Sequence, residues 1–248
     1  MKKFIRITIV NTILLKALED PWYYDMFIVL TFDDGYRDHF YIAKNIMDRY
    51  GFKGVEFVVI KWLRDYSNND MFLSISELNE MDRDGWDISS HTLSHPRLTE
   101  IDRNSVVYEL LESRRWLDEH GFSKGAKFFA SPYGAYNDEV IKEIQRFYVM
   151  HRTVDEGINT LRALDLYRLK SVLTPLASSW FGWKEYLKWF ESSYTHIDDK
   201  IVIITIHRID PEVFRELCDY INNMVLSGRA KVVTFSDLYD DILKNRMI

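Results

Sequence analysis

Cysteine, proline and glycine are all scarce in this chain of 248 residues, which contains one, five and ten of them respectively. A single cysteine excludes a disulfide within the chain and any metal site built from several thiolates. Cys218 lies in an amphipathic stretch, so we expect a buried structural thiol there rather than a nucleophile. The few glycines and prolines, without an internal repeat or a low-complexity linker, predict one domain over 1–248, with 1–24 as a short N-terminal extension.

Excess basic charge and long apolar runs are also lacking. The 32 basic and 38 acidic residues leave a formal net charge of −6, which argues against a nucleic-acid partner. The apolar stretch over residues 4–18 is interrupted by Arg6, Asn11 and Lys16, so it lacks the continuous core of a signal peptide and is too short and polar for a membrane span. These features predict no integral membrane span and a cytoplasmic location, with export by an atypical N-terminus left open. The oligomeric state is not indicated.

Short apolar runs alternate with amphipathic stretches, which indicates an α/β fold. Runs such as 201–206 are continuously apolar and rich in β-branched residues, as is typical of parallel strands buried on both faces. The strands are expected at 27–32, 54–60, 86–89, 127–130, 147–151, 168–173, 200–206 and 231–234. The helices are expected at 37–50, 75–84, 100–120, 137–146, 180–192, 211–227 and 236–245. Seven or eight such repeats predict a closed or nearly closed (β/α) barrel of about seven parallel strands, with a doubly wound open sheet as the alternative.

Residues capable of chemistry follow four of these expected strands. In either fold the active site lies at the C-terminal ends of the strands. The residues at this edge are Asp33, Asp34, His91, His95, 131–134 and His207. Two adjacent carboxylates are hard to explain by stability, because an ionised carboxylate in a dry site needs a partner or a metal. The competing interpretation of the pair is an Asx-turn or a helix N-cap after a strand.

The two histidines after the third expected strand form a candidate metal site with an aspartate. His91 and His95 are four residues apart, which would place both imidazoles on one face of a helical turn. A carboxylate from another strand end completes a site of two histidines and one aspartate, which leaves coordination positions for water and substrate. Zinc is the first expectation for such a site, and nitrogen and oxygen ligands would also accept cobalt, nickel or iron(II).

These motifs, in this order, resemble those of the polysaccharide deacetylases, the NodB-homology or carbohydrate esterase family four enzymes. The segment 31–35 (TFDDG) resembles the first motif of the family, and 91–95 (HTLSH) resembles the second. The segment 129–134 (FASPYG) is similar to the third motif, and 203–207 (IITIH) is similar to the last. The resemblance covers roughly residues 25–240 and implies a distorted, incomplete (β/α) barrel.

The resemblance also implies an activity, the metal-dependent removal of acetyl from an N-acetylated sugar. Three side chains would hold one divalent metal ion: Asp34, His91 and His95. Asp33 would be the general base that deprotonates the attacking water, and His207 the general acid that protonates the leaving amine. The backbone N–H of Tyr133 would bind the oxyanion, with Pro132 and Gly134 shaping its loop. The alternative for His207 is a buried histidine satisfied by a backbone partner.

The third motif departs from the pattern of many family members. They carry an arginine that orients the catalytic aspartate, and this chain has Ala130 at that position. Another cation is therefore expected beside Asp33. Arg168 and Lys170, near a later expected strand, are the first candidates, and Arg152 is a further one.

Substrate contacts are less clearly marked. Tyr36, next to the aspartate pair, and Trp180 are candidates, and the insert over 61–73 is expected at the rim of the site. Trp183 is expected to pack in a helix, and the fourth family motif is not evident. The remaining histidines are expected on the surface or in loops: His39, His120, His151 and His196.

Three functions remain open from the sequence. The first is a de-N-acetylase of a sugar or oligosaccharide, with an N-acetylated carbohydrate as partner. The second keeps the fold and the metal but cleaves another non-peptide C–N bond, of the cyclic ureide or imide type. The third is a non-catalytic carbohydrate-binding remnant, which the retention of all the expected ligand, base and acid residues disfavours. The lack of a clear export signal favours an intracellular oligosaccharide, lipid-linked sugar or nucleotide-sugar precursor as substrate.

Overall fold

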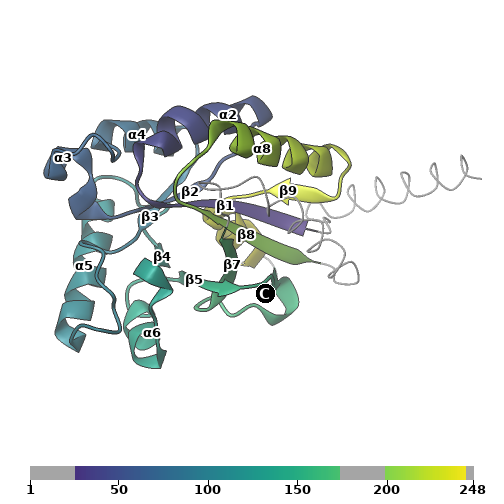
Figure 1. Ribbon diagram of the computed structural model, residues 1–248. Helices are drawn as coiled ribbons and strands as arrows, with labels where there is room; N and C mark the ends of the chain where they lie inside the picture. The colour runs from purple at the N-terminus through teal and green to yellow at the C-terminus, as the bar shows by residue number, and fades with distance from the viewer. Residues whose placement is uncertain (1–25, 174–198, 244–248) are drawn as a thin grey trace, which may run out of the picture.

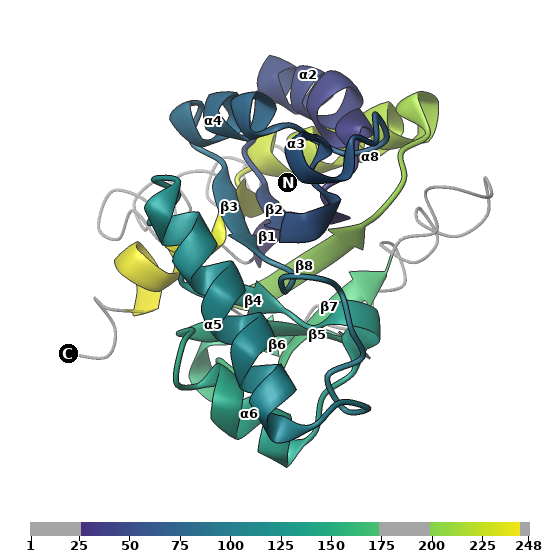
Figure 2. The same ribbon diagram turned by 90° about the vertical axis from the view of Figure 1, so that its left-hand side faces the viewer.

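Seven parallel strands close into a barrel in the computed structural model, which describes residues 26–173 and 199–243 (Figures 1 and 2). The order of the strands around the barrel is β1-β2-β3-β4-β5-β7-β8, and β8 pairs again with β1. The bounds are β1 (Met26–Asp34), β2 (Val55–Val58), β3 (Asp87–Ser90), β4 (Phe128–Ala130), β5 (Met150–Glu156), β7 (Leu169–Leu173) and β8 (Lys200–Ile206). Because β8 hydrogen-bonds both β7 and β1, the barrel prediction is confirmed and the open sheet is excluded.

The barrel is distorted, and its strands pair unevenly. The register between β3 and β4 contains only the pair Ser90 and Phe129, and β5 carries a bulge between Arg152 and Glu156. Two short strands extend the sheet, β9 (Ala230–Val232) parallel to the start of β1 and β6 (Asn159–Thr160) antiparallel to β8. The antiparallel strand was not expected, and β5 begins and ends later than the predicted 147–151.

Helices cover two sides of the barrel (Figures 1 and 2). The elements α2, α4 and α8 gather on one side, whereas α5 and α6 pack on the other. The helices within the described residues are η1 (His39–Lys44), α2 (Asn45–Met47), η2 (Asp48–Tyr50), η3 (Ile60–Trp62), α3 (Arg64–Ser67), α4 (Ile75–Arg83), α5 (Arg103–Glu119), η4 (Pro132–Gly134), α6 (Asp138–Ile144), η5 (Leu161–Ala163), α8 (Pro211–Leu226) and η6 (Asp237–Leu243). The expected helix over 180–192 lies outside the described residues. No helix within the described ranges combines the length and apolar character needed to span a membrane.

Side-chain caps mark the start of several helices. Ser74 and Glu77 form a capping box at the start of α4, and Asn137 accepts a hydrogen bond from Val140 N at the start of α6. At the last helix the hydroxyl of Thr234 accepts from the Asp237 N–H.

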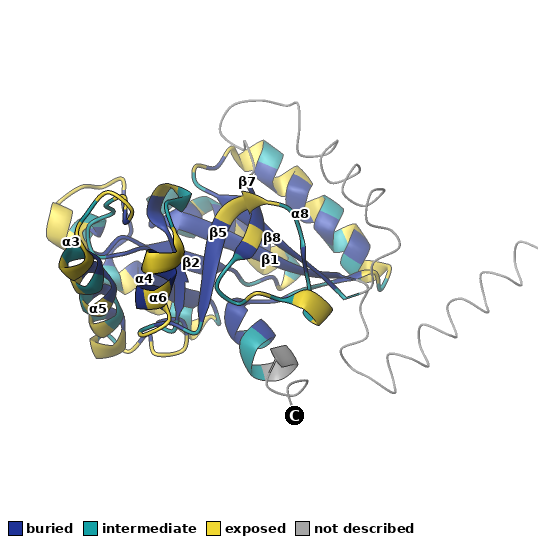
Figure 3. Cartoon of the chain, turned by 90° about the horizontal axis from the view of Figure 1, so that it is seen from below, coloured by how far each residue is buried: buried dark blue, intermediate teal, exposed yellow. Residues whose placement is uncertain are grey.

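Side chains of the barrel strands alternate between two apolar clusters. One fills the barrel and includes Phe27 and Val29 of β1, while the other lies between the barrel and the helices and includes Ile28 and Leu30. The helices turn their buried faces toward the barrel and their exposed faces outward (Figure 3). Cys218 on α8 is buried, as predicted. The alternation places Asp33 on the face of β1 that lines the barrel interior, in series with Phe27 and Val29.

Candidate functional site

The predicted site residues meet at the C-terminal ends of β1, β3 and β8. Asp33 and Asp34 end β1, and both are almost fully buried. His91 and His95 follow β3, and His207 follows β8. The chain leaves β1 through two residues in the left-handed region, Asp34 at φ 76° and Gly35 at φ 78°. This turn brings the second carboxylate around toward the histidines.

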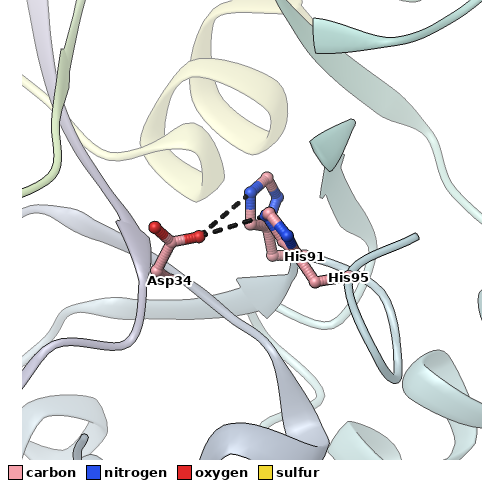
Figure 4. Close-up of side chains that lie close together, drawn as sticks. All are labelled: Asp34, His91 and His95. Atoms are coloured by element: carbon pink, nitrogen blue, oxygen red, sulfur yellow. Dashed lines mark ion pairs between the residues drawn. The ribbon is translucent and has the colours of Figure 1, made fainter. Parts of the chain in front are cut away.

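One carboxylate oxygen and two imidazole nitrogens converge on one point (Figure 4). Asp34 Oδ1 lies 3.2 Å from His95 Nε2 and 3.6 Å from His91 Nε2. Ligand atoms from these three residues all lie within 4.8 Å of one another. The structure therefore brings together the three residues that the sequence proposed as metal ligands.

The histidine segment is a loop and not the helical turn that the spacing suggested. Thr92 and His95 have left-handed backbones, at φ 73° and 65°, so the segment 91–95 does not continue as a helix. The buried Glu109 of α5 holds the loop, since its Oε2 accepts from Leu93 N at 2.9 Å and from Ser94 N at 2.8 Å. The Ser94 hydroxyl donates to the other oxygen, Oε1. Glu109 was not identified from the sequence, because two of its three partners are backbone amides.

The protonation of His91 shows that the three residues fit a cation. His91 Nδ1 lies 2.8 Å from the carbonyl oxygen of Ala130, which only accepts, so Nδ1 carries the proton. Burial lowers the pKa of His91 to about 4, so the ring is neutral near pH 7 and Nε2 presents a lone pair. That lone pair faces the Asp34 carboxylate, whose buried Oδ1 accepts no hydrogen bond within the described residues.

The carboxylate of Asp34 is ionised in this setting. Burial acts to raise its pKa, but the imidazoles of His95, 3.2 Å away, and of His91 outweigh it and lower the pKa to about 2. Two acceptors that face each other across a buried gap repel unless a cation lies between them. Nitrogen and oxygen donors of this kind suit zinc, cobalt, nickel or iron(II).

The cation beside Asp33 is Arg152, and the preference for Arg168 and Lys170 was wrong. Arg152 Nη2 donates to Asp33 Oδ1 at 2.6 Å and to Oδ2 at 2.5 Å, with both side chains buried. Arg168 instead pairs with Asp138 at 2.6 Å, and Lys170 is exposed on β7. The later end of β5 explains the difference: the strand continues to Glu156, so Arg152 lies inside it, on the interior face in series with Met150.

Arg152 keeps Asp33 ionised in the barrel interior. Burial acts to raise the pKa of Asp33, but the Arg152 guanidinium and the nearby histidines lower it below its ordinary value. The guanidinium lies 5.3 Å from the centre of the Phe57 ring. No acceptor for Arg152 Nε or Nη1 is present among the residues described. Asp33 is therefore the group that offsets this buried charge.

His207 faces the same carboxylate from the end of β8. Its Nε2 lies 3.8 Å from Asp33 Oδ2, and 42% of its side chain is exposed. A fully buried histidine satisfied by a backbone partner was the alternative for this residue, and this exposure excludes it. The imidazole is open to solvent on one side and to the carboxylate on the other.

The turn after β4 presents Tyr133 in a strained backbone conformation. Tyr133 has φ 57° and Gly134 has φ 62°. A Cβ atom on Gly134 would collide with the Val154 side chain, so this position requires glycine. Gly134 N and Ala135 N make the two backbone hydrogen bonds of the turn, to residues 131 and 132. Neither bond uses the Tyr133 N–H.

Buried His151 braces this turn from behind. The hydroxyl of Ser131 lies 2.8 Å from His151 Nε2, and His151 Nδ1 lies 2.8 Å from Tyr167 O. Burial lowers the pKa of His151 to about 4, so the neutral ring donates from Nδ1 and accepts from Ser131 at Nε2. The expectation that His151 and His39 lie on the surface or in loops was wrong for both, because both are fully buried.

Aromatic side chains line the rim of the site. Tyr36 stacks on Phe72 with centroids 5.4 Å apart, and Trp62 lies 5.3 Å from Phe72 and 4.6 Å from His95. Burial and the nearby Asp34 carboxylate raise the pKa of Tyr36. Leu73 N donates to Gly35 O, so the segment 61–73 lies beside the candidate site as expected. Trp180, Trp183 and His196 lie outside the described residues.

Comparisons with known proteins give consistent results. The profile of the family described as "Polysaccharide deacetylase" matches residues 25–150. The chain is 28% identical over 158 residues to YxkH of Bacillus subtilis (strain 168), itself assigned to the polysaccharide deacetylases, across 62% of this chain and 54% of that protein. The chain spans about half the length of the relatives it matches.

Solved structures share the fold. The Xyl-CE4 domain of a multidomain xylanase from the hindgut metagenome of Trinervitermes trinervoides aligns at a TM-score of 0.61 and 19% identity, over 86% of this chain and 89% of that one. The deacetylase PplD of Streptococcus pyogenes, solved in complex with acetate, aligns at a TM-score of 0.53 and 26% identity, over 57% and 62% of the two chains. At these identities the first comparison supports the barrel alone.

Proposed function

The chain belongs to the polysaccharide deacetylase family, and we propose that it is a metal-dependent de-N-acetylase acting on an N-acetylated sugar or oligosaccharide. The observation that carries the proposal is the neutral imidazole of His91 turned toward the unpartnered carboxylate oxygen of Asp34. That arrangement is unfavourable by itself and becomes favourable around a divalent cation. Beside this cation site lies a second carboxylate, Asp33, which is paired with Arg152. A metal ion with a carboxylate base next to it suits the hydrolysis of an amide.

Asp34, His91 and His95 would hold the ion, and zinc suits this donor set best. When bound, such an ion supplies an activated water near neutral pH and polarises the carbonyl under attack. Hydrogen bonds to neighbouring residues fix the orientation of these ligands. His91 is fixed through Nδ1 by the Ala130 carbonyl, and the loop before His95 is fixed by Glu109.

Asp33 would accept the proton of the attacking water. Its carboxylate is ionised at neutral pH, because Arg152 lowers its pKa against the effect of burial. The two hydrogen bonds from Arg152 also fix the direction of the carboxylate, which limits the motion of the base relative to the metal site. Asp33 is thereby separated in role from its neighbour Asp34.

His207 and the turn at Tyr133 would complete the reaction. His207 lies 3.8 Å from Asp33 and 42% of its side chain is exposed, so it can deliver a proton to the amine of a substrate that enters from solvent. The Tyr133 N–H, which takes no part in the hydrogen bonds of its own turn, would stabilise the developing oxyanion. The stacked pair of Tyr36 and Phe72 offers an apolar wall for a sugar ring.

Metal replacement combined with acetate release tests the proposal. The chain is stripped with a chelator, reloaded with zinc, cobalt, nickel or iron(II), and supplied with N-acetylated chito-oligosaccharides and other N-acetylated sugars. We expect acetate only from the loaded protein. Bound metal without acetate from any such sugar would favour the hydrolysis of another C–N bond, and a protein that binds no metal would favour a carbohydrate-binding remnant.

A further inference from the structure

We propose that His39, oriented by Glu56, is a positioning residue that fixes the loop carrying His207 by donating a hydrogen bond to the His207 backbone carbonyl. The proposal rests on the proposed function, in which His207 gives a proton to the leaving amine. Neither His39 nor Glu56 belongs to the motifs that define the metal site. Both side chains are fully buried, so neither can contact a substrate.

The strand pairing places Glu56 and His39 close to the end of β8, where His207 follows. Phe32 of β1 pairs with Glu56 of β2 on one side and with Ile206 of β8 on the other. Glu56 and Phe32 point toward the helices, where the His39 ring packs against Phe32 with centroids 5.2 Å apart. His39 is the first residue of η1, the helix that follows the aspartate pair. Its ring lies over Phe32 and contacts Glu56 of β2 on one side and His207, after β8, on the other.

The protons of the pair can be assigned from its partners. His39 Nε2 contacts the carbonyl oxygen of His207, which only accepts, so Nε2 carries a proton. His39 Nδ1 lies 2.9 Å from Glu56 Oε1 and 3.1 Å from Oε2. One proton is shared there, whether as imidazolium with carboxylate or as imidazole with carboxylic acid. In both forms Glu56 fixes the rotation of the ring and keeps Nε2 aimed at the loop.

Stability alone does not account for a buried pair of this kind. Replacing a buried ion pair by apolar residues of similar volume is often neutral or stabilising, so its presence is weak evidence of a structural purpose. Phe32 packs against the His39 ring, and Phe214 packs against Phe32. The pair therefore has an apolar environment on this side. Besides Glu56, the His39 ring faces Asp38 Oδ1, 3.8 Å from its Nε2, and the His207 carbonyl, and only the carbonyl contact reaches the residue that would act as the acid.

The neighbouring residue Asp38 holds the same loop. Asp38 Oδ2 lies 3.0 Å from Arg208 Nε and accepts from Ile209 N at 3.3 Å. The Arg208 guanidinium in turn lies 4.8 Å from the centre of the Tyr36 ring. Three consecutive loop residues are thus tied to the segment that follows the aspartate pair. The His207 imidazole approaches Asp33 no closer than 3.8 Å, so its position depends on this hold on its backbone.

The test uses two amide variants at position 39 in the zinc-loaded protein. H39Q places an amide near the position of Nε2 and keeps a donor for the His207 carbonyl, whereas H39N places it near Nδ1 and loses that donor. We expect H39N to lower kcat about 100-fold, the cost of a displacement of roughly 1 Å at a catalytic group. KM and zinc content stay at the parental values, and H39Q recovers most of kcat. H120N is the matched control, because His120 bonds only within its own helix region.

A second pair of variants covers the case in which H39N does not fold. E56L replaces the carboxylate with an apolar side chain, and the buried His39 ring then becomes neutral, because burial lowers its pKa once Glu56 is absent. E56Q keeps a polar group that can donate to Nδ1. We expect E56L to lower kcat as H39N does and E56Q to retain most of it. Equal losses in E56L and E56Q, or in H39N and H39Q, contradict the proposal.

The H207A background separates positioning from a general structural effect. If His39 acts through His207, H39N lowers kcat no further once His207 is absent. An additional loss of similar size in H207A overturns the proposal.

A readout without substrate distinguishes this inference from the proposed function. Hydrogen exchange at the Ile209 amide, followed by NMR in the zinc-loaded protein, is expected to accelerate about tenfold or more in H39N and to stay near parental in H39Q. If the parent releases no acetate, the proposed function fails while this measurement still tests the contact. Parental exchange and parental kcat in H39N would together refute the role of His39.

Discussion

The two adjacent aspartates at the end of β1 are both buried, but they have different partners. Asp33 lies inside the barrel with both oxygens bonded to Arg152. Asp34 lies in a left-handed turn with Oδ1 facing two imidazoles and no hydrogen bond among the described residues. Successive residues of a strand point to opposite faces, and the chain turns at Asp34, so two adjacent residues lie in different environments.

The electrostatics of the two carboxylates differ in the same way. Both have a lowered pKa, but Asp33 owes it to a permanent cation, Arg152. Asp34 owes it to histidines, one of which has a pKa of about 4 and is therefore neutral near pH 7. The charge of Asp33 is offset within the protein, whereas that of Asp34 needs a cation from outside. This is the physical basis for assigning the base to one and the ligand to the other.

The largest expected effect comes from Asp34. Loss of a residue that only orients a metal ligand lowers metal affinity by about 10–100-fold. Because Asp34 would bind the ion directly, we expect D34N to lower zinc affinity by more than about 100-fold. Acetate release is then lost at any practical zinc concentration. Calorimetric titration of the chelator-treated protein with zinc measures the first effect. Zinc binding at parental affinity in D34N would remove Asp34 from the ligand set.

Asp33 is expected to behave differently. D33N should bind zinc as the parent does while kcat falls about 10²–10⁴-fold, the range for losing a general base. The buried Arg152 then loses its partner, so the free energy of unfolding should drop by about 3–5 kcal/mol. Zinc titration, steady-state kinetics and urea unfolding test the three statements. If D33N and D34N lose zinc to the same extent, the division of roles between them is wrong.

Arg152 gives a prediction about pH. The base acts only when deprotonated, and Arg152 lowers the pKa of Asp33, so activity is retained to a lower pH than an unpaired buried aspartate would allow. Removing the cation in R152M raises that pKa, and the acidic limb of kcat/KM should move to higher pH. R152K keeps the positive charge but lacks the guanidinium donors, so the acidic limb of its kcat/KM profile should move less. An unchanged acidic limb in R152M with zinc still bound would contradict this account of Asp33.

The smallest effect is expected at the two cations first suspected from the sequence. R168A removes a surface ion pair with Asp138, and K170A removes an exposed side chain. Each should leave kcat/KM unchanged and alter the free energy of unfolding by about 1 kcal/mol or less. A loss of activity in either variant, with zinc retained, would restore it as a candidate partner of Asp33.

Prediction from the sequence succeeded where the signal was local. The apolar runs located every strand of the barrel, and the rule that polar residues follow strand ends collected Asp34, His91 and His95. The same logic misjudged the shape of the histidine segment, since a spacing of four fits both a helical turn and a loop. Left-handed backbones at Thr92 and His95 distinguish the two, and the sequence does not reveal them.

The supporting residues were harder to identify. Glu109 holds its loop through two backbone amides, and His39 holds the His207 loop through a backbone carbonyl, and residue types in the sequence do not indicate such backbone partners. Arg152 was among the candidates, but a boundary error in β5 put it beyond the end of the expected strand. Only residues inside a strand follow its alternation of faces, so the end of β5 decides whether Arg152 is expected to point into the barrel.

Hydrophobic periodicity and strand-end motifs lie in contiguous residues, so the strands and the metal-binding and catalytic candidates could be predicted, but a barrel and an open sheet both remained possible. Which groups pair, and whether the sheet closes, depends on contacts between distant residues. Asp33 and Arg152 are 119 residues apart, and His39 and His207 are 168 apart. These contacts exist only once β8 has paired with β1 and closed the barrel. Closure sets the distances between strands, and those distances determine which carboxylate is compensated within the protein and which remains available for a metal.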